Sequence, residues 1–540
     1  MQEEVISPLV DSTGQSPRRV LFSTFRSALP SFSNCGLALA SAVLLIVAFP
    51  DFELWPLAWV ALVPLMLAVR TTARPARAFF LGLLCGTVFF YGSCYWLTYS
   101  MIHFGGIPAP IAYALLIPGA IVMGLFPALF ALVLAFVVRR FASLAFICAP
   151  VIWVGTEWLR LQTTGQLWNA LGYSQAYQPA LIQAARWGGV YATSLIVVAV
   201  NAAVVLLVLR KKPNVIAGLV LTIVFALIIV LGFATRPEAE SFSDPKADIG
   251  VVAVQPNVPM DLEKPLDQMR MLTDEHFSTS EAALGTLPAD KPRLVIWPES
   301  PMNFTYGTDT QLQERLAAFA RSHHVSLIFN SQEAAPNEGL YNSALLVNEE
   351  GRLIAQYDKI RLLPFGEYDP LPRWFPGAGL ITAIVGDFTP GTNYRQMEIG
   401  PVRAGVFICI ESAYPNIARR YAHDGSNVLI NISNDGYLGP TAVMRQHLAN
   451  TVFRAVENGR PLLRVTNTGI TAAITSRGEV VDPTQGFEKD VRVWRVSGQQ
   501  DSSNTFYIKY GDIFAVSCAV ITLVLLVVSF RRKSGLLNKA

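Results

Sequence analysis

The chain has 540 residues, of which 52% are hydrophobic and 15% are charged. Soluble proteins average about 25% charged residues, so this composition argues against a wholly soluble chain and favours a membrane protein. The net charge of +3 is too small to favour nucleic acid as a partner, and the length exceeds that of one ordinary domain.

Seven apolar segments fill the first half of the chain, and an eighth lies near its end. A helix needs about 20 apolar residues to span a bilayer, with a usual range of roughly 17–25, so the second and fifth segments are short. A polar leader precedes the first segment, which is therefore not read as a cleaved signal peptide. The predicted spans are 34–50, 55–70, 79–101, 111–138, 144–159, 189–210, 214–235 and 513–530.

Basic residues mark alternate loops between these spans. Because Lys and Arg accumulate in cytoplasmic loops, the pattern predicts eight spans with both ends of the chain in the cytoplasm. The resulting organisation is a leader at 1–33, a seven-helix membrane domain at 34–235, a last span at 512–531 and a tail at 532–540. The marker residues are Arg18, Arg19, Arg26, Arg70, Arg74, Arg77, Arg139, Arg140 and the runs at 210–212 and 531–533.

A segment of different composition separates the last two spans. After a linker at 236–248, residues 249–505 carry the charges, turns and short strands of a soluble domain, which the alternating topology places outside the cytoplasm. Apolar strands mixed with amphipathic helices favour an α/β sandwich with buried sheets. We predict strands at 249–254, 293–297, 325–330, 343–348, 352–357, 402–410, 427–432 and 462–466, and helices at 311–322 and 441–458.

The six cysteines are distributed unevenly. Five lie in or beside the apolar spans, and Cys409 alone lies in the predicted extracytoplasmic domain. It has no disulfide partner there, although that compartment is oxidising. Such a thiol is either buried and inert or kept for chemistry. The other five are Cys35, Cys85, Cys94, Cys148 and Cys518.

Three strand ends carry ionisable residues that suffice for acyl transfer through a thioester. Glu299 lies in "LVIWPES", Lys359 and Glu367 lie in "IAQYDKIRLLPFGEY", and Cys409 lies in "VFICIES". A carboxylate can take the proton of a thiol, and an ammonium can stabilise both the thiolate and the oxyanion of an acyl intermediate. Spacing alone leaves open that Glu299 is a solvated strand end and Lys359 an ordinary surface charge.

The segments "WPES", "YDKIRLLPFGEY" and "CIES" resemble the Glu-Lys-Cys motifs of the nitrilase superfamily in order and in flanking residues. Eight spans around such a domain, with "GRPLLRVTNTGIT" at 459–471, are similar to its membrane branch, the apolipoprotein N-acyltransferases of the Gram-negative inner membrane. The resemblance covers the chain beyond the polar leader. It implies a multi-span α-helical membrane domain plus an extracytoplasmic α/β domain, a nitrilase-like αββα sandwich in the periplasm.

The resemblance implies a two-step acyl transfer. Cys409 attacks an ester of a membrane phospholipid, and the thioester then passes its acyl chain to the N-terminal amine of the diacylglyceryl-cysteine of an apolipoprotein. Glu299 is then the base, and Lys359 stabilises the oxyanion together with a backbone N–H near Ile410.

Two further carboxylates take supporting roles by the same resemblance. Glu367 orients Lys359, and Glu411, two residues after the nucleophile, supports the site. We expect no cofactor and no metal, because no C-x-x-C or H-E-x-x-H spacing is present. We expect a monomer.

The segment "LPRWFPGAGLITAIVGDF" (371–388) follows the predicted lysine closely and holds Trp374 and Phe375 among Pro and Gly. We expect it to be a lid or a membrane-dipping arm that admits acyl chains. The alternative is a loop that packs on its own domain.

Weaker signals remain beside this interpretation. His423 or His447 could pair with Cys409 as a Cys-His dyad, and Glu157 and Arg160 read mostly as anchors at the membrane interface. Two other functions are considered: a membrane-tethered nitrilase-like amidase or nitrile hydrolase with water as the second nucleophile, and a transporter with a binding domain. A soluble substrate needs one anchor rather than eight spans, and charges within the spans are few.

Overall fold

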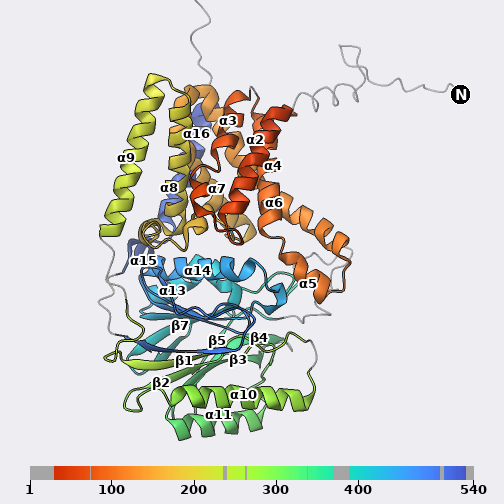
Figure 1. Cartoon of the computed structure of the whole chain (residues 1–540), viewed down its shortest axis with the longest axis vertical. Coiled ribbons are helices and arrows are strands. Elements are labelled where there is room, and N and C mark those ends of the chain that lie inside the picture. The colour runs from red at the N-terminus through yellow and green to blue at the C-terminus, as the bar shows by residue number, and fades with distance from the viewer. Residues whose placement is uncertain are drawn as a thin grey trace, which may run out of the picture.

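The computed structural model describes residues 29–72, 74–234, 240–261, 264–336, 339–369, 388–498 and 504–530. A bundle of helices forms one end of the molecule and an α/β domain forms the other (Figure 1). The chain enters the α/β domain after the bundle and returns to the bundle with its last described helix, so both parts belong to one continuous structure.

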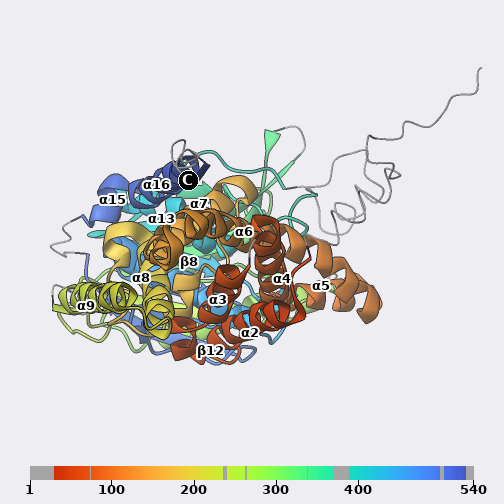
Figure 2. The ribbon, with the colours of Figure 1, turned by 90° about the horizontal axis from the view of Figure 1, so that it is seen from above.

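Within the described residues, five helical segments are long and apolar enough to cross a membrane, and two shorter apolar helices accompany them. The bundle lies with α9 at one rim and α5 at the opposite side (Figure 2). Its helices are α2 (Phe32–Ala48), α3 (Val63–Thr71), α4 (Pro75–Ser93), α5 (Leu97–His103), α6 (Ala109–Phe141), α7 (Ala149–Thr164), α8 (Ala185–Val208), α9 (Lys212–Ala234) and α16 (Ile513–Phe530).

Three predicted spans differ from the observed helices, and one of them, 55–70, consists of a 3-10 turn (Trp55–Trp59) followed by α3, which starts only at Val63. The segment 79–101 is divided, because α4 ends at Ser93 and the chain turns before α5. The indole of Trp96 in this turn donates to Gln446 Oε1 (3.1 Å), a contact with the α/β domain that the local sequence does not reveal. The segment 144–159 begins as a 3-10 turn (Ala142–Cys148), and α7 starts only at Ala149 with Pro150 in its first turn, where proline is favoured.

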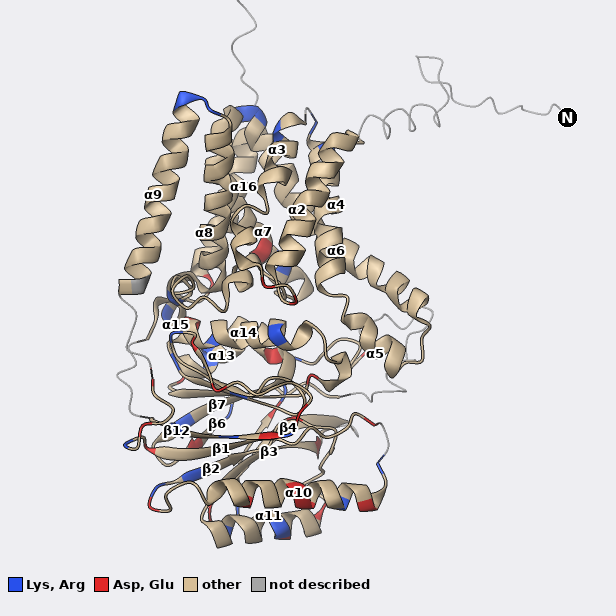
Figure 3. Cartoon of the chain, viewed as in Figure 1, with Lys and Arg blue, Asp and Glu red and all other residues tan. Residues whose placement is uncertain are grey.

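Charged residues are distributed unevenly along the length of the bundle. Most of the bundle carries few charges, and Lys and Arg gather at the end that lies away from the sheets (Figure 3). Arg70 closes α3, Arg139 and Arg140 lie in the last turn of α6, and Lys212 begins α9. These positions are among the basic marker residues of the sequence.

Two six-stranded sheets form the α/β domain. In the first, β1, β2 and β3 are parallel, while β4 is antiparallel to both β3 and β5. In the second, β7, β8 and β9 are parallel. The first sheet, in spatial order, is β12 (Asp490–Val496), β1 (Ile249–Gln255), β2 (Arg293–Ile296), β3 (Ser326–Ala334), β4 (Leu340–Val347) and β5 (Leu353–Asp358); the second is β11 (Val480–Val481), β10 (Ala472–Ile474), β9 (Leu462–Thr466), β8 (Val428–Ser433), β7 (Val402–Ile408) and β6 (Gln396–Ile399).

The sheets pack face to face between two pairs of helices (Figure 1). In β1, Val252 and Val254 join the core beneath α10 (Leu266–Leu284) and α11 (Thr310–His323), whereas Val251 and Ala253 join the core between the sheets. This strand is buried on both faces, which explains its unbroken apolar sequence. The predicted α/β sandwich is confirmed.

The second helix pair, α13 (Pro415–His423) and α14 (Val443–Asn458), lies between the second sheet and the bundle (Figure 1). The side chain of Gln446 at the start of α14 joins four groups of the bundle: its Nε2 donates to the carbonyls of Pro50 (2.8 Å) and Ser93 (3.0 Å), and its Oε1 accepts from the indoles of Trp96 (3.1 Å) and Trp168 (2.8 Å). All of its hydrogen-bonding groups are therefore satisfied by the bundle.

A buried ion pair makes a second junction further along α14. Arg454 and Glu457, both fully buried, lie 2.8 Å apart (Nε to Oε2). Oε1 of Glu457 accepts from the backbone N–H of Val190 (2.9 Å), just after the break that Gly189 (φ +65°) introduces into α8. The α/β domain is thus fixed to the bundle through polar groups that find partners only when the two parts are in contact.

Candidate active site

Lys359 follows the last residue of β5 and points into the interior. Its ammonium lies 2.8 Å from Glu367 Oε1 and 3.4 Å from Glu299 Oε1, and its side chain is 1% exposed. Burial acts to lower the pKa of Lys359, but the two carboxylates outweigh it and hold this pKa above its usual value. Lys359 is therefore a fixed positive charge rather than a surface lysine.

Glu299 and Lys359 share one edge of the first sheet. β2 is parallel to β3, and β5 is also parallel to β3, because β4 lies between them and is antiparallel to both. β2 and β5 therefore run in the same direction, and their carboxyl ends lie at the same edge of the sheet. Because β4 runs the other way, its first residues lie at the same edge, and there Asn342 donates from Nδ2 to Glu299 (2.9 Å) and to Glu367 (2.8 Å). Sequence reasoning missed Asn342; its signal is an amide at the start of an apolar strand.

Both carboxylate oxygens of Glu367 accept hydrogen bonds. One oxygen accepts from Lys359 and Asn342, and the other accepts from the backbone N–H of Leu363 (2.7 Å). The carboxylate therefore fixes the position of the ammonium in a buried setting, which is the geometry that the expected orienting role needs.

Cys409 comes from the second sheet. The strand predicted at 402–410 ends at Ile408, and Cys409 is the first residue of a 3-10 turn, Cys409–Ala413. Its φ of +51° is uncommon for a residue with a side chain and marks a sharp elbow. Burial raises the pKa of its thiol and Glu299 raises it further, while Lys359 lowers it. Burial thus favours the protonated thiol, and an attack by this sulfur would require a base.

Glu411 connects the two strand ends that carry Lys359 and Cys409. Its Oε1 accepts from Tyr357 (2.7 Å) and from the backbone N–H groups of Ile360 (2.8 Å) and Arg361 (3.0 Å), which follow Lys359. Its Oε2 accepts from the N–H of Ile408 (2.7 Å), just before Cys409. The fully buried carboxylate of Glu411 thereby joins the loop that follows Lys359, at the end of the first sheet, to the turn that begins with Cys409, at the end of the second sheet.

We expect Glu411→Gln to destabilise the protein and to reduce its activity. The amide retains one acceptor oxygen, but its NH₂ group then faces an N–H donor, and a buried unsatisfied donor costs about 1–3 kcal/mol. Thermal unfolding of the purified variant measures the first effect and acyl transfer the second. A variant with unchanged melting temperature and activity would contradict this structural role.

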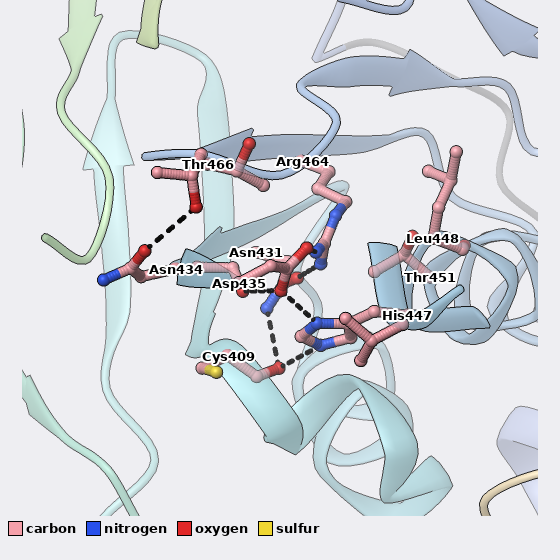
Figure 4. A network of polar contacts seen from close by, with 12 residues as sticks. Cys409, Asn431, Asn434, Asp435, His447, Leu448, Thr451, Arg464 and Thr466 are labelled. Atoms are coloured by element: carbon pink, nitrogen blue, oxygen red, sulfur yellow. Dashed lines mark hydrogen bonds and ion pairs between the residues drawn. The ribbon is translucent and has the colours of Figure 1, made fainter. Parts of the chain in front are cut away.

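The remaining predicted residues lie elsewhere. His423 is exposed and contacts Asp424 (3.1 Å). His447 contacts the carbonyl oxygen of Cys409 (3.0 Å), and the sulfur points away from its ring (Figure 4), so neither histidine forms the considered dyad. Trp374 and Phe375 lie outside the described residues. Among those described, no group of three or more His, Cys, Asp and Glu side chains is arranged to hold a metal ion.

Glu157 and Arg160 do not act as the interface anchors expected from the sequence. Both are buried, at 5% and 3% exposure. Glu157 accepts from the indole of Trp153 and from the N–H of Leu171 (both 2.8 Å), and Arg160 donates to the carbonyl of Trp168 (2.7 Å). They stabilise the segment that follows α7 from inside the bundle.

The fold and the site define a carbon–nitrogen hydrolase domain of nitrilase type, carried by a membrane bundle. Residues 249–499 match the family model "Carbon-nitrogen hydrolase", and residues 41–203 match the "Apolipoprotein N-acyltransferase N-terminal domain". The chain belongs to the apolipoprotein N-acyltransferase family, as the sequence resemblance indicated.

Relatives named apolipoprotein N-acyltransferase are similar along nearly the whole chain. The protein of Geobacter metallireducens is 33% identical over 92% of this chain and 95% of the relative, and that of Nitrosomonas europaea is 30% identical over 92% and 97%. Among solved structures, an amidase from Nesterenkonia sp. has 17% identity and a TM-score of 0.36, covering 49% of this chain and 94% of its own.

Proposed function

We propose that Cys409 takes an acyl chain from a membrane phospholipid as a thioester and transfers it to the N-terminal amine of a diacylglyceryl-cysteine. By its family the chain is an N-acyltransferase that acts on a lipoprotein with a phospholipid donor. The observation that carries the mechanism is the buried ammonium of Lys359 between the carboxylates of Glu299 and Glu367, which supplies an oxyanion-stabilising charge and a base at one place.

In the first step Glu299 takes the proton of the Cys409 thiol as the sulfur attacks the ester carbonyl. The oxyanion of the tetrahedral intermediate is stabilised by Lys359 and by the N–H of Ile410. When the intermediate collapses, the C–O bond of the ester breaks, and the leaving oxygen of the lysophospholipid takes the proton from Glu299. The products are a thioester on Cys409 and a free lysophospholipid.

In the second step the neutral amine of the acceptor attacks the thioester carbonyl. Glu299 takes a proton from the attacking nitrogen, and the same donors stabilise the second oxyanion. Collapse then breaks the C–S bond, and the sulfur recovers the proton. An amide is formed and the enzyme returns to its starting state. The atoms and protons of both steps are accounted for without a cofactor.

The charge distribution supports an extracytoplasmic location of the active site. Lys and Arg gather at the end of the bundle away from the sheets (Figure 3), and such residues favour the cytoplasmic side. The catalytic domain then lies on the outer face of the membrane, and we assign it to the periplasmic side of the inner membrane of a Gram-negative bacterium. We propose that the protein acts as a monomer.

The kinetic test of the proposed function uses the order of events. Phospholipid alone is expected to yield up to about one lysophospholipid per enzyme and then stall, because a covalent intermediate accumulates until its acceptor arrives. A diacylglyceryl-cysteine peptide is then expected to discharge the acyl group from Cys409. Mass spectrometry of the Cys409 peptide before and after the addition measures both events.

The discharge is expected to become faster as the pH rises through about 7.7–8.0, where an α-amino group loses its proton. The matched control is the same peptide with an acetylated N-terminus, which cannot accept. Continuous lysophospholipid release without acceptor would instead identify a membrane-tethered hydrolase, with water as the second nucleophile.

A further inference from the structure

The carbonyl oxygen of Cys409 is held by two side chains from outside the Glu-Lys-Cys group. Nε2 of His447, in α14, lies 3.0 Å from it, and Nδ2 of Asn431, in β8, lies 3.4 Å from it (Figure 4). A carbonyl oxygen only accepts, so both nitrogens are donors here. His447 is 3% exposed and Asn431 is fully buried.

These two donors belong to one closed polar network. Nδ1 of His447 lies 2.7 Å from Asp435 Oδ1, Arg464 Nη2 lies 2.9 Å from Asp435 Oδ2, and Arg464 Nη1 donates to Asn431 Oδ1 (2.6 Å) (Figure 4). Asp435 and Arg464 are 1% and 0% exposed. Each donor to the Cys409 carbonyl is thus fixed by the same buried ion pair, in a site that excludes water.

The protonation state of Asp435 agrees with this arrangement. Burial acts to raise the pKa of Asp435, but Arg464 and His447 outweigh it and hold this pKa below its usual range, so Asp435 is ionised. Nε2 of His447 faces the carbonyl oxygen of Cys409, which only accepts, so this nitrogen carries a proton. Burial, followed by Arg464, lowers the pKa of His447, while Asp435 and the carbonyl of Cys409 act to raise it.

The geometry of the peptide bond gives the network a consequence for catalysis. The C=O of Cys409 and the N–H of Ile410 belong to the same planar trans peptide and point in opposite directions. A side chain that fixes the orientation of the Cys409 C=O therefore also fixes the orientation of the Ile410 N–H. The elbow at Cys409 has a φ of +51°, a conformation that persists where surrounding groups hold it in place.

We propose that His447 is a positioning residue of the oxyanion hole. By holding the carbonyl of Cys409, it directs the N–H of Ile410 at the oxyanion of each tetrahedral intermediate. Hydrogen bonds on the carbonyl also polarise the peptide, which strengthens the N–H as a donor. This inference rests on the proposed thioester chemistry, and it assigns no role to the ring of His447 as a base.

The test compares two reactions of the same sulfur. Acyl transfer from phospholipid passes through an oxyanion, whereas alkylation of Cys409 by iodoacetamide does not. His447→Leu keeps a side chain of similar bulk without a donor, and it is expected to reduce acylation about 10²–10³-fold, the usual cost of one oxyanion donor. Its alkylation rate at Cys409, followed by mass spectrometry, is expected to stay within about threefold of the wild type, since no oxyanion donor is involved.

Two further variants sharpen the comparison. His447→Gln retains an N–H donor for the Cys409 carbonyl and is expected to acylate at least about tenfold faster than His447→Leu. Thr451→Ala is the matched control, because Thr451 is a fully buried polar residue one turn along α14 whose hydroxyl donates to Leu448 of its own helix (2.7 Å). It is expected to leave both reactions unchanged.

Equal losses of acylation and alkylation in His447→Leu would show that His447 only supports the fold. Unchanged acylation would show that the Cys409 carbonyl needs no hydrogen bond from His447. Either result overturns the proposal. If His447→Leu does not fold, Asn431→Leu removes the second donor to the same carbonyl and is read in the same way. If the wild-type protein forms no acyl-enzyme, the proposed function itself has failed.

Discussion

Cys409→Ser is expected to abolish acyl transfer while leaving the fold and the membrane insertion intact. Burial already raises the pKa of the thiol, and a serine hydroxyl is far less acidic, so Glu299 cannot activate it. Loss of a nucleophile reduces turnover by about 10⁴-fold or more. Lysophospholipid release measures the effect, and thermal unfolding checks that the variant is folded.

The matched control for this variant is Cys518→Ser, which alters a buried cysteine of α16 within the bundle. That change is expected to leave turnover close to the wild-type value. Near-normal turnover of Cys409→Ser would rule out the thioester mechanism, whatever the other residues of the site contribute.

Glu299→Gln is expected to reduce both half-reactions by about 10²–10⁴-fold, the usual contribution of a general base. The amide matches the carboxylate in size and can still accept the hydrogen bond of Asn342 (2.9 Å). Glu367 remains 2.8 Å from Lys359, so the ammonium keeps a counter-charge. The fold and phospholipid binding should therefore persist while the base is lost.

Vesicle binding and acylation of Cys409 are measured side by side for this variant. The control is Glu275→Gln, which removes a carboxylate paired with Lys489 (2.6 Å) at the surface, where one ion pair contributes about 0–1 kcal/mol. If Glu299→Gln acylates at the normal rate, Glu299 is only a strand end and another group takes the proton.

One helix connects the membrane domain with Cys409. In α14, Gln446 is bound to four groups of the bundle, and the next residue, His447, contacts the carbonyl of Cys409. Further along, Arg454 donates to the carbonyl of Ser412 (3.2 Å) in the same turn as Cys409. The position of the turn that carries Cys409 is thus fixed in part by the bundle, with which the α/β domain is in close contact.

The sequence by itself determined the parts of this protein that depend on local patterns. Long apolar segments predicted membrane helices because the bilayer sets their length, and the last segment, 513–530, coincides with α16. Short apolar runs that end in Glu299, Lys359 and Cys409 predicted buried strands with polar residues at their ends. The resemblance of the flanking residues then indicated the family, which the comparisons confirmed.

Only the tertiary structure decided which of these residues meet, and with what other groups. Asn342 reaches Glu299 because β4 runs antiparallel to its neighbours, and Glu411 links two sheets whose strands are far apart in sequence. The two hydrogen-bond partners of His447, Asp435 and Cys409, likewise come from different segments of the second half of the chain. Local sequence specifies strands and helices, but strand order and helix packing specify which buried polar groups satisfy one another, because each such group must find its partner across the fold.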